Sequence, residues 1–399
     1  MHVGVFFGDR PQDAGGGFTF TGEIFESLLD VSGESHHQFS LICSASDAEV
    51  YAERMKNLPI RVVAYKQLGL PGRGLEMLRR YVPVFRRWAG PSPIERAART
   101  AGVEFMWFAS AGTVPVDLPY LTVVWDLQHR LQPYFPEISA AGEWYTRELA
   151  YVWFLQRAAV VIAGTRAGHA EIERFYQVPG ERIKILAHPT PRFALNAPEK
   201  NLEGIPKKYG IPERAFLLYP AQFWAHKNHV NLLLAMRELK DKHGLTIHLV
   251  LVGSDKGNLA HVQQRTRELG LSPQVHFLGF VPQEELVWLY RHALALVYVT
   301  LCGPENLPPL EAFALGCPVV ASSVAGAEEQ LGNAALLVDP KSPEHIAGAI
   351  KSVHDDADLR HLLTQRGRER ALKWRGQDFV RGVFSILDEF EPIRRCWGR

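Results

Sequence analysis

Residues 302–322 read CGPENLPPLEAFALGCPVVAS, a stretch in which two glutamates lie among glycines, prolines and apolar residues. Pro308 and Pro309 suit the first turn of a helix, where a backbone N–H has no intrahelical partner. Gly316 is a residue type that commonly ends a helix, and the apolar run after it is typical of a buried strand. The stretch therefore predicts a loop, a short apolar helix and a strand, with Glu311 near the start of the helix.

A carboxylate at this helix start allows two interpretations. The helix dipole alone stabilises a negative charge there. Alternatively, free N–H groups near Leu307 bind a phosphate, and Glu311 accepts hydrogen bonds from ribose hydroxyls. The second interpretation predicts a cradle for a nucleotide diphosphate, with Glu305 and Asn306 in the loop that leads into it.

Short apolar runs alternate with amphipathic stretches along the chain, a pattern typical of βα units and parallel sheets. Two series of such runs are separated by residues 188–206, which are rich in proline and polar residues and read as a linker. The pattern predicts two doubly wound α/β domains, over residues 1–190 and 205–375, that face each other across a cleft. Residues 376–399 add a C-terminal helix that can cross back to the first domain.

Composition excludes several classes of function. A formal net charge of +1 over 399 residues gives no reason to expect nucleic acid or an acidic partner. The four cysteines are scattered, without a C-x-x-C pair or a histidine at metal-ligand spacing, and indicate reduced thiols. The first residues lack the basic region of a signal peptide, and no apolar run approaches the length of a membrane span. We therefore expect a cytoplasmic protein.

The loop after the first strand contains three consecutive glycines, Gly15–Gly17, directly before a helix. Gly16 and Gly17 would let a phosphate or a sugar hydroxyl approach the backbone at the helix N-terminus. The alternative is a flexible turn. The loop is not a dinucleotide fingerprint, because it is longer than G-x-G-x-x-G and no acidic residue clearly ends the second strand.

Lys227 lies where the first strand of the second domain leads into a helix, in the stretch LYPAQFWAHKNHVNLLLA. A lysine at a helix start is electrostatically unfavourable, because the helix dipole is already positive there. An anion in the cleft would resolve the conflict, with His226 and Asn228 beside it. The alternative is a solvated surface lysine. Two further loops are candidates, since Gly253 would permit close approach of a ligand and the turn at Phe280 has backbone groups for a base edge.

These residues resemble those of the family-4 retaining glycosyltransferases, which have the GT-B fold, and the resemblance runs along nearly the whole chain. Its specific part is the pattern LP..EA.A.G.PV in a strand–loop–helix–strand setting, matched here by residues 307–319. The family's glycine-rich loop is matched by Gly15–Gly17, and its lysine after the first strand of the second domain is matched by Lys227.

Two positions depart from the family's pattern. The first glutamate of its E-x7-E segment would fall at Gly303, and Glu305 is out of register with it. That glutamate is thought to contact the donor sugar, so the departure leaves the identity of the sugar open. Gln222 stands where the family commonly has an arginine. Without this arginine the diphosphate would face one positive charge fewer. Lys227, helped by His226, would then carry more of the interaction.

In the first domain, residues 122–138, TVVWDLQHRLQPYFPEI, occupy the place where the family has a histidine near the scissile sugar. The usual position is Trp125, which is followed by Asp126 and His129. His129 either faces the cleft or is a surface residue paired with Asp126. The sequence leaves these two arrangements open.

The resemblance implies two Rossmann-like domains, the first on the acceptor side and the second binding the nucleotide-sugar donor. It implies a hexosyltransferase-like enzyme that moves a sugar from a nucleotide-diphosphate sugar to a hydroxyl of a glycan or lipid-linked acceptor, with retention and without metal or other cofactor. Its setting would be cell-surface polysaccharide or glycolipid assembly. We assign catalytic roles to Lys227, Glu311, His129 and Asp126, and donor binding to Gly16, Gly17, Gln222, His226, Asn228, Gly253, Phe280, Glu305, Asn306 and Leu307.

Two other functions stay open. The absence of one family glutamate is compatible with a non-catalytic nucleotide-sugar-binding protein, which turnover would exclude. A GT-B epimerase or phosphorylase is the second alternative. The LPPLEA segment fits the transferase better, and an epimerase would interconvert sugars without any acceptor.

Residues 72–90, GRGLEMLRRYVPVFRRWAG, interleave five arginines with apolar and aromatic residues. Such a stretch suits peripheral contact with an anionic membrane, at the inner face of which a lipid-linked acceptor would lie. The alternative is a solvated face, because Pro83 interrupts a helix there and arginines often decorate such faces.

Overall fold

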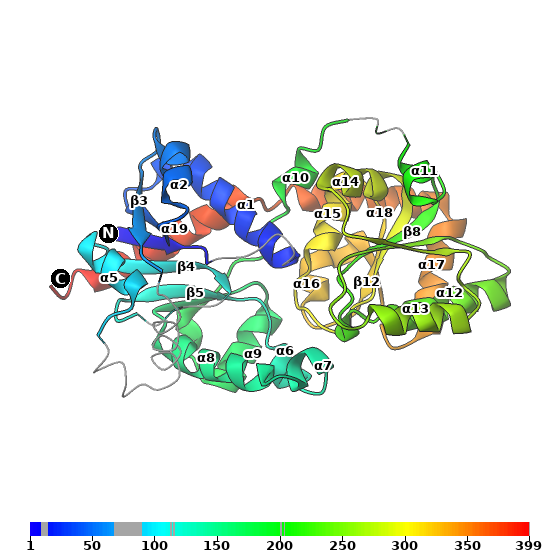
Figure 1. The fold of residues 1–399 in the computed structure, drawn as a ribbon, viewed down its shortest axis with the longest axis horizontal. Coiled ribbons are helices and arrows are strands. Elements are labelled where there is room, and N and C mark those ends of the chain that lie inside the picture. The colour runs from blue at the N-terminus through cyan, green and yellow to red at the C-terminus, as the bar shows by residue number, and fades with distance from the viewer. Residues whose placement is uncertain are drawn as a thin grey trace. The chain divides into compact units, whose positions relative to one another are not determined.

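The computed structural model describes residues 1–8, 15–67, 90–111, 114, 116–199, 202 and 204–398. The chain folds into two compact units (Figure 1). Unit 1 comprises Met1–Leu131, Ala141–Ala187 and Gly376–Arg399, and unit 2 comprises Gln132–Ala140 and His188–Arg375. The stretch predicted to contact a membrane lies outside the described residues except for Gly90. Within the described ranges, no helix combines the length and the apolar character needed to cross a bilayer.

Unit 1 is built on a seven-stranded sheet of order β3-β2-β1-β4-β5-β6-β7, in which every pairing is parallel. Its central strands are buried at nearly every position, as expected for a parallel sheet covered on both faces. The strands are β1 (His2–Phe6), β2 (Gln38–Ser44), β3 (Ile60–Tyr65), β4 (Phe105–Ala111), β5 (Tyr120–Val124), β6 (Val160–Ala163) and β7 (Ile183–Ile185).

The helices of unit 1 connect these strands and cover the sheet. They are α1 (Gly16–Val31), η2 (Ser32–Glu34), α2 (Ala48–Met55), α5 (Pro93–Thr100), α6 (Gln128–Leu131), α8 (Glu143–Arg157), α9 (Arg166–Tyr176), η3 (Gly180–Arg182) and α19 (Gly376–Arg394). Helix α19 belongs to unit 1 although it follows all of unit 2 in the chain. It packs along α1 (Figure 1). The rings of Phe379 and Phe20, one on each helix, meet edge to face at 5.6 Å.

Unit 2 contains a second parallel sheet, with six strands in the order β10-β9-β8-β11-β12-β13. Its strands are β8 (Phe216–Pro220), β9 (Leu249–Val252), β10 (Val275–Gly279), β11 (Ala293–Tyr298), β12 (Val319–Ser322) and β13 (Ala335–Val338). The order builds outward in one direction from β8 to β10 and then in the other from β11 to β13. The switch point of this doubly wound sheet therefore lies between β8 and β11, where ligands of such sheets bind.

The helices of unit 2 alternate with these strands, and the predicted doubly wound α/β class is confirmed for both units. The helices of unit 2 are α7 (Pro136–Ser139), α10 (Arg192–Leu195), α11 (Ile205–Tyr209), η4 (Ala225–Lys227), α12 (His229–His243), α13 (Leu259–Glu268), α14 (Gln283–His292), α15 (Leu307–Leu315), α16 (Ala327–Leu331), η5 (Gly332–Ala334), α17 (Pro343–Asp355) and α18 (Ala357–Ala371).

The composition of the units differs from the predicted domains in two segments. Residues 132–140 and 188–190, expected within the first domain, group with unit 2. The side-chain Nε2 of Gln132 donates a hydrogen bond to the carbonyl of Leu301 at 2.7 Å, and Glu137 contacts His226. These contacts are between residues distant in the chain, so no local pattern in the sequence indicates them.

Candidate functional site

The loops that follow β8 and β11 meet at the switch point of unit 2. The carbonyl of His226 accepts hydrogen bonds from the backbone N–H of Leu301 at 2.8 Å and from the hydroxyl of Thr300 at 3.3 Å. Residues 221–228 and 299–306, which the sequence marked as candidate donor-binding loops, are therefore brought together. This meeting of two loops at the carboxyl edge of the sheet is the position at which α/β sheets hold their ligands.

Lys227 is the last residue of η4 and directly precedes Asn228, the N-cap of α12. Its Nζ donates to the hydroxyl of Tyr298 at 3.0 Å, and its backbone carbonyl accepts from the hydroxyl of Tyr219 at 2.5 Å. Lys227 forms no ion pair with any residue of the described ranges. A neutral hydroxyl does not cancel the charge of the ammonium, so Lys227 keeps a positive charge that an anion could use.

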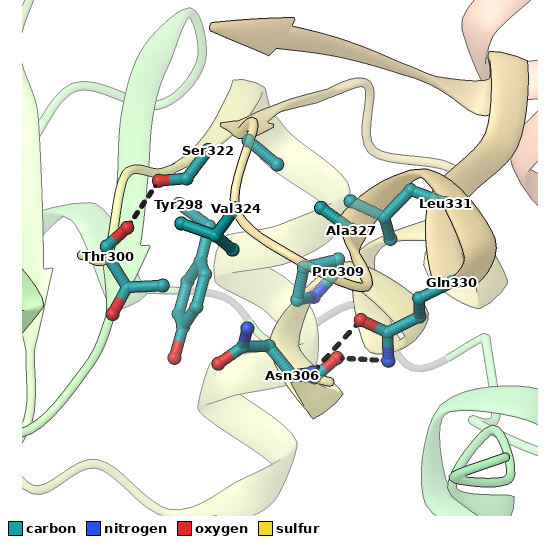
Figure 2. Close-up of a pocket in the computed structure, with 10 residues that line it drawn as sticks. Tyr298, Thr300, Asn306, Pro309, Ser322, Val324, Ala327, Gln330 and Leu331 are labelled. Carbon is teal, nitrogen blue, oxygen red and sulfur yellow. Dashed lines mark hydrogen bonds between the residues drawn. The ribbon is translucent and has the colours of Figure 1, made fainter. Parts of the chain in front are cut away.

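A pocket of about 240 Å³, open solvent included, opens beside Tyr298 at the carboxyl ends of β11 and β12 (Figure 2). Five of its ten lining residues have side chains that can hydrogen-bond to hydroxyl or phosphate groups, whereas most of its exposed wall is apolar. Figure 2 shows Asn306 and Gln330 joined by two hydrogen bonds and Ser322 bonded to the carbonyl of Thr300. The lining residues are Tyr298, Thr300, Asn306, Pro309, Ala321, Ser322, Val324, Ala327, Gln330 and Leu331.

The N-terminus of α15 reaches this pocket through Asn306 and Pro309. Asn306 is the N-cap, but its side chain donates to the carbonyl of Gly303 at 3.0 Å and makes no capping bond. Its own backbone N–H is bonded to Gln330 at 2.9 Å. Because the next two residues after Leu307 are prolines, Leu307 carries the first N–H of the helix that a ligand could use. The predicted cradle of N–H groups is thus reduced to very few donors.

Glu311 is buried on the inner side of α15 and is not among the residues that line the pocket. Its Oε2 accepts a hydrogen bond of 2.7 Å from the hydroxyl of Tyr290, on α14. Burial raises the pKa of Glu311 to about 7, although the bond from Tyr290 acts in the opposite direction. Among the described residues, none is hydrogen-bonded to Oε1, so Tyr290 orients the carboxyl group and leaves one oxygen for another partner.

Glu305, predicted to bind the donor, is instead hydrogen-bonded to His188, the residue at which the main segment of unit 2 begins. Its Oε1 accepts from the backbone N–H of His188 at 2.6 Å, and Oε2 lies 3.6 Å from Nε2 of the same residue. Burial raises the pKa of Glu305 to about 8 and lowers the pKa of His188 to about 4, so neutral forms of both are favoured. A carboxyl group bonded in this way inside the unit is not presented to a ligand.

Asn228 also has a different position from the predicted one. Its side chain points into unit 2, where Nδ2 donates to the carbonyls of Val299 at 2.8 Å and Pro340 at 2.7 Å. Its backbone is left-handed, with φ of 62°. Asparagine tolerates this conformation better than most residues. Asn228 therefore ties the loops after β8, β11 and β13 together and does not offer its amide to a donor.

Gly253 makes a close approach, but to the protein's own backbone and not to a ligand. A Cβ at this position would lie 2.4 Å from the carbonyl oxygen of Ala221, and its φ is 151°. Neither the space nor the conformation accommodates a side chain. The glycine lets the ends of β8 and β9 come together, which is a structural requirement.

The remaining predicted donor-binding residues of unit 2 lie at the same edge of the sheet. Gln222 donates to Ser254 Oγ at 3.2 Å and accepts from Trp224 Nε1 at 3.1 Å, so its amide supports the loop and does not replace the charge of an arginine. His226 lies at 2.5 Å from Glu137 through its Nδ1. Phe280, just after β10, is 71% exposed, and its ring is available for a flat partner.

In unit 1, Gly16 and Gly17 begin α1, after Gly15 as its N-cap with φ of 64°. Their N–H groups belong to the first turn, where the helix itself provides no acceptor. The preceding residues of the glycine loop, 9–14, lie outside the described residues.

The structure agrees with neither arrangement expected for His129. The side chain is fully buried, and Nε2 lies 2.7 Å from the hydroxyl of Tyr176 and 3.3 Å from Glu148. Burial, with the charge of Arg147, lowers the pKa of His129 to about 4. Asp126 pairs with Arg147 at 2.6 Å and not with the histidine. Both residues therefore belong to networks within unit 1. The side chain of His129 is directed into the unit from the short helix α6.

Tyr298 and Gln330 were missed by the sequence analysis although they line the pocket. Tyr298 ends an apolar run that reads only as a strand, and Gln330 lies on a short helix without any motif. Their position next to the predicted stretch 302–322 was the available signal, because residues at the ends of neighbouring parallel strands share one edge of the sheet.

The residues that line the pocket include no histidine, cysteine or acidic side chain. Among the described residues, the one group of three or more histidine, cysteine or acidic side chains that could reach a common ion is His36, His37 and Asp388, and this group lies in unit 1.

Two doubly wound parallel units are the architecture of the GT-B class of fold, and a lysine and a helix N-terminus lie beside the pocket at the carboxyl edge of the second sheet. The chain carries a glycosyltransferase domain, since residues 203–370 match the family of glycosyl transferases group 1. Similar proteins include the O-antigen chain mannosyltransferase B of Escherichia coli, 30% identical over 54% of this chain and 57% of that protein. Another is the D-inositol 3-phosphate glycosyltransferase of Corynebacterium jeikeium, 31% identical over 47% of this chain and 46% of that protein. The chain thus spans about half the length of these relatives.

Solved structures agree with the GT-B fold along nearly the whole chain. The sucrose-phosphate synthase of Thermosynechococcus elongatus has a TM-score of 0.72 at 17% identity, and the comparison covers 98% of this chain and all of that one, 100%. The structure of Anabaena HepE in complex with UDP and glucose has a TM-score of 0.67 at 15% identity, covering 98% and 100%. Likeness at these identities establishes the fold alone.

Proposed function

We propose that this protein is a retaining glycosyltransferase that moves a sugar from a nucleotide-diphosphate sugar to a hydroxyl of a glycan or lipid-linked acceptor. The observation that carries the proposal is the ammonium of Lys227, bonded only to neutral partners in the described part of the chain, next to Tyr298 of the pocket at the carboxyl edge of the sheet. The group 1 domain over residues 203–370 supports the same conclusion.

Departure of the leaving group is the step that these residues would assist. When the bond from the sugar to the diphosphate breaks, negative charge develops on the phosphate oxygens and positive charge on the sugar. In this proposal Lys227 and the N–H of Leu307 stabilise the diphosphate, since preorganised donors of this kind are the usual source of large rate effects. Positive charge on the protein takes the role that a metal ion has in other transferases, so we propose that no metal is required. Retention at the anomeric carbon rests on the resemblance to the family-4 enzymes.

Relatives that are named for O-antigen mannosyl transfer and inositol phosphate glycosylation support an acceptor in cell-surface glycan or glycolipid assembly. The HepE complex with UDP supports a nucleotide-diphosphate sugar as donor for proteins of this fold. Neither fixes the base or the sugar, and the departures at Gly303 and Gln222 concern the positions that would contact the sugar and the diphosphate.

The test is incubation of the purified protein with a panel of nucleotide-diphosphate sugars, with and without glycan acceptors, followed by mass spectrometry. Release of the nucleoside diphosphate from one donor, undiminished by EDTA, is the expected result. Binding without turnover of any donor and acceptor would favour the non-catalytic alternative. Conversion of one nucleotide sugar into another without an acceptor would favour an epimerase, and phosphate-dependent release of a sugar phosphate would favour a phosphorylase.

Glu311 provides a prediction about the nucleotide. Glu311→Gln removes the charge but keeps the bond from Tyr290 sterically possible, so we expect a roughly tenfold loss of nucleoside-diphosphate affinity at pH 8. The loss should be smaller at pH 6, because burial raises the pKa of Glu311 to about 7 and the wild-type carboxyl is then largely protonated. Isothermal titration calorimetry at the two pH values measures the difference.

The same variant should not be less stable, because an ionised buried carboxylate costs free energy above its ordinary pKa and glutamine does not. Glu213→Gln, at an exposed position of unit 2, is the matched control. Equal affinity of Glu311→Gln and wild type at pH 8 would leave the carboxylate with a purely structural role.

Peripheral contact with the inner face of an anionic membrane through residues 72–90 is part of the proposal, because a lipid-linked acceptor lies there. Five arginines at about 1 kcal/mol each would give reversible attachment. Sedimentation with anionic vesicles should recover more protein in the pellet at low salt than at high salt. Full recovery in the supernatant at low salt would exclude the contact.

A further inference from the structure

Lys227 ends a helical segment of only three residues, η4, whose middle residue is His226. A single 3-10 turn has little stability of its own, so the position of Lys227 depends on what holds its neighbours. The backbone N–H of Lys227 is bonded to Trp224 at 3.1 Å and its carbonyl to Tyr219 at 2.5 Å. His226, in the middle of this turn, is bonded to Glu137 on one side and to the loop after β11 on the other.

On one side, His226 is bound by Glu137. A single carboxylate oxygen of Glu137, Oε1, lies 3.2 Å from the backbone N–H of His226 and 2.5 Å from its ring Nδ1. The ring of Phe135 meets the imidazole edge to face at 6.2 Å. Burial raises the pKa of Glu137, but its hydrogen bonds with His226 outweigh this effect and hold that pKa below the ordinary value. Glu137 therefore presents an ionised carboxylate to the turn.

On the other side, the carbonyl of His226 accepts from Leu301 and from Thr300, which lines the pocket. The segment that carries Glu137 is attached to the same loop, since Gln132 donates to the carbonyl of Leu301 at 2.7 Å. His226 is thus held between residues 132–140 and the loop after β11. The residue that follows it, Lys227, receives its place beside Tyr298 from this arrangement.

We propose that Glu137 is a positioning residue for the anion site. Its carboxylate fixes His226 and, through the backbone of η4, holds Lys227 where its ammonium can bind the diphosphate. The inference rests on the proposed function, because it requires a nucleoside diphosphate as the ligand. Glu137 itself does not touch the ligand. Its effect should appear only in affinity for the group that Lys227 meets, and not in affinity for the rest of the nucleotide.

The test measures that selectivity by titration calorimetry with UDP and GDP and with the corresponding monophosphates, UMP and GMP. Wild type should bind one diphosphate more tightly than its monophosphate. Glu137→Gln should reduce this preference about tenfold while monophosphate affinity is unchanged, since one charge-assisted contact is lost indirectly. Glu137→Asp, which keeps the charge on a shorter side chain, should recover part of the preference. Glu143→Gln, an exposed glutamate at the start of α8, is the control and should behave as wild type.

The outcomes separate the two proposals. If Glu137→Gln retains the full preference for the diphosphate while Lys227→Ala loses it, the positioning role is wrong and the anion site stands. If Glu137→Gln weakens both ligands equally and lowers the melting temperature, Glu137 has only a structural role. If wild type binds neither UDP, GDP nor any other nucleoside diphosphate of the donor panel better than its monophosphate, the proposed function itself is contradicted.

Discussion

Lys227→Ala should lower the turnover number for the preferred donor by about 10²–10³-fold, the usual cost of removing one preorganised donor that stabilises a developing charge. The physical reason is that Lys227 brings an uncancelled ammonium next to the pocket at the carboxyl edge of the sheet, with the hydroxyl of Tyr298, which lines that pocket, as its protein partner at 3.0 Å. Steady-state kinetics with the donor identified from the panel give the measurement. The melting temperature should change little, because the side chain forms no ion pair within the described residues.

Two further variants make the comparison sharp. Tyr298→Phe removes the partner hydroxyl but leaves the ammonium, so we expect a loss well below that of Lys227→Ala. Lys240→Ala, at an exposed position near the other end of α12, controls for the loss of one surface charge and should match wild type. Unchanged turnover in Lys227→Ala with an unchanged melting curve would mean that the lysine is a solvated surface residue and that the diphosphate binds elsewhere.

The sheets of both units could be predicted from the sequence because parallel strands buried on both faces are continuous apolar runs. Such runs include β8 (Phe216–Pro220) and β10 (Val275–Gly279), in each of which only the last residue is of a type that is depleted in strands. The helix over the LPPLEA segment was predicted from its prolines and Gly316, and it is α15, ended by Gly316 with φ of 76°. Each of these signals is contained within a few neighbouring residues.

The partners of the polar side chains could not be predicted, because they come from distant parts of the chain. Glu305 is bonded to His188, which is 117 residues away, and Asn228 to Pro340, which is 112 residues away. A motif at a strand end indicates that a polar residue lies near the ligand edge, but not whether its side chain faces the ligand or another loop. Glu305 and Asn228 face other loops, whereas Lys227 faces the pocket wall.

Histidine 129 illustrates the same limit in unit 1. The motif around it suggested a catalytic or surface position, but the side chain is fully buried and bonded to Tyr176, 47 residues away. With its pKa lowered to about 4 by burial, His129 stays neutral near pH 7 and stabilises the packing of α6 against α8 and α9. Its proposed role in catalysis therefore has less structural support than that of Lys227.

Asn228→Ala should lower the free energy of unfolding by about 2–3 kcal/mol, because it leaves a buried carbonyl without its donor and places alanine in a left-handed conformation. Val299 is fully buried, and its carbonyl would lose the bond of 2.8 Å from Asn228. The carbonyl of Pro340 would keep a second donor, Asn231, at 3.2 Å, so its loss is smaller. Urea unfolding followed by circular dichroism measures the change.

Asn228→Gly separates the two causes of this loss. Glycine removes the same hydrogen bonds but accepts the φ of 62° without strain, so it should be more stable than Asn228→Ala by about 1 kcal/mol. Both variants should still bind the nucleoside diphosphate at temperatures where they are folded, because the amide of Asn228 is directed at Val299 and Pro340 and not at the pocket. A variant that melts like wild type but loses nucleotide affinity would instead support the donor-binding role predicted from the sequence. The distinction decides whether Asn228 stabilises the junction of the loops after β8, β11 and β13 or contacts the donor.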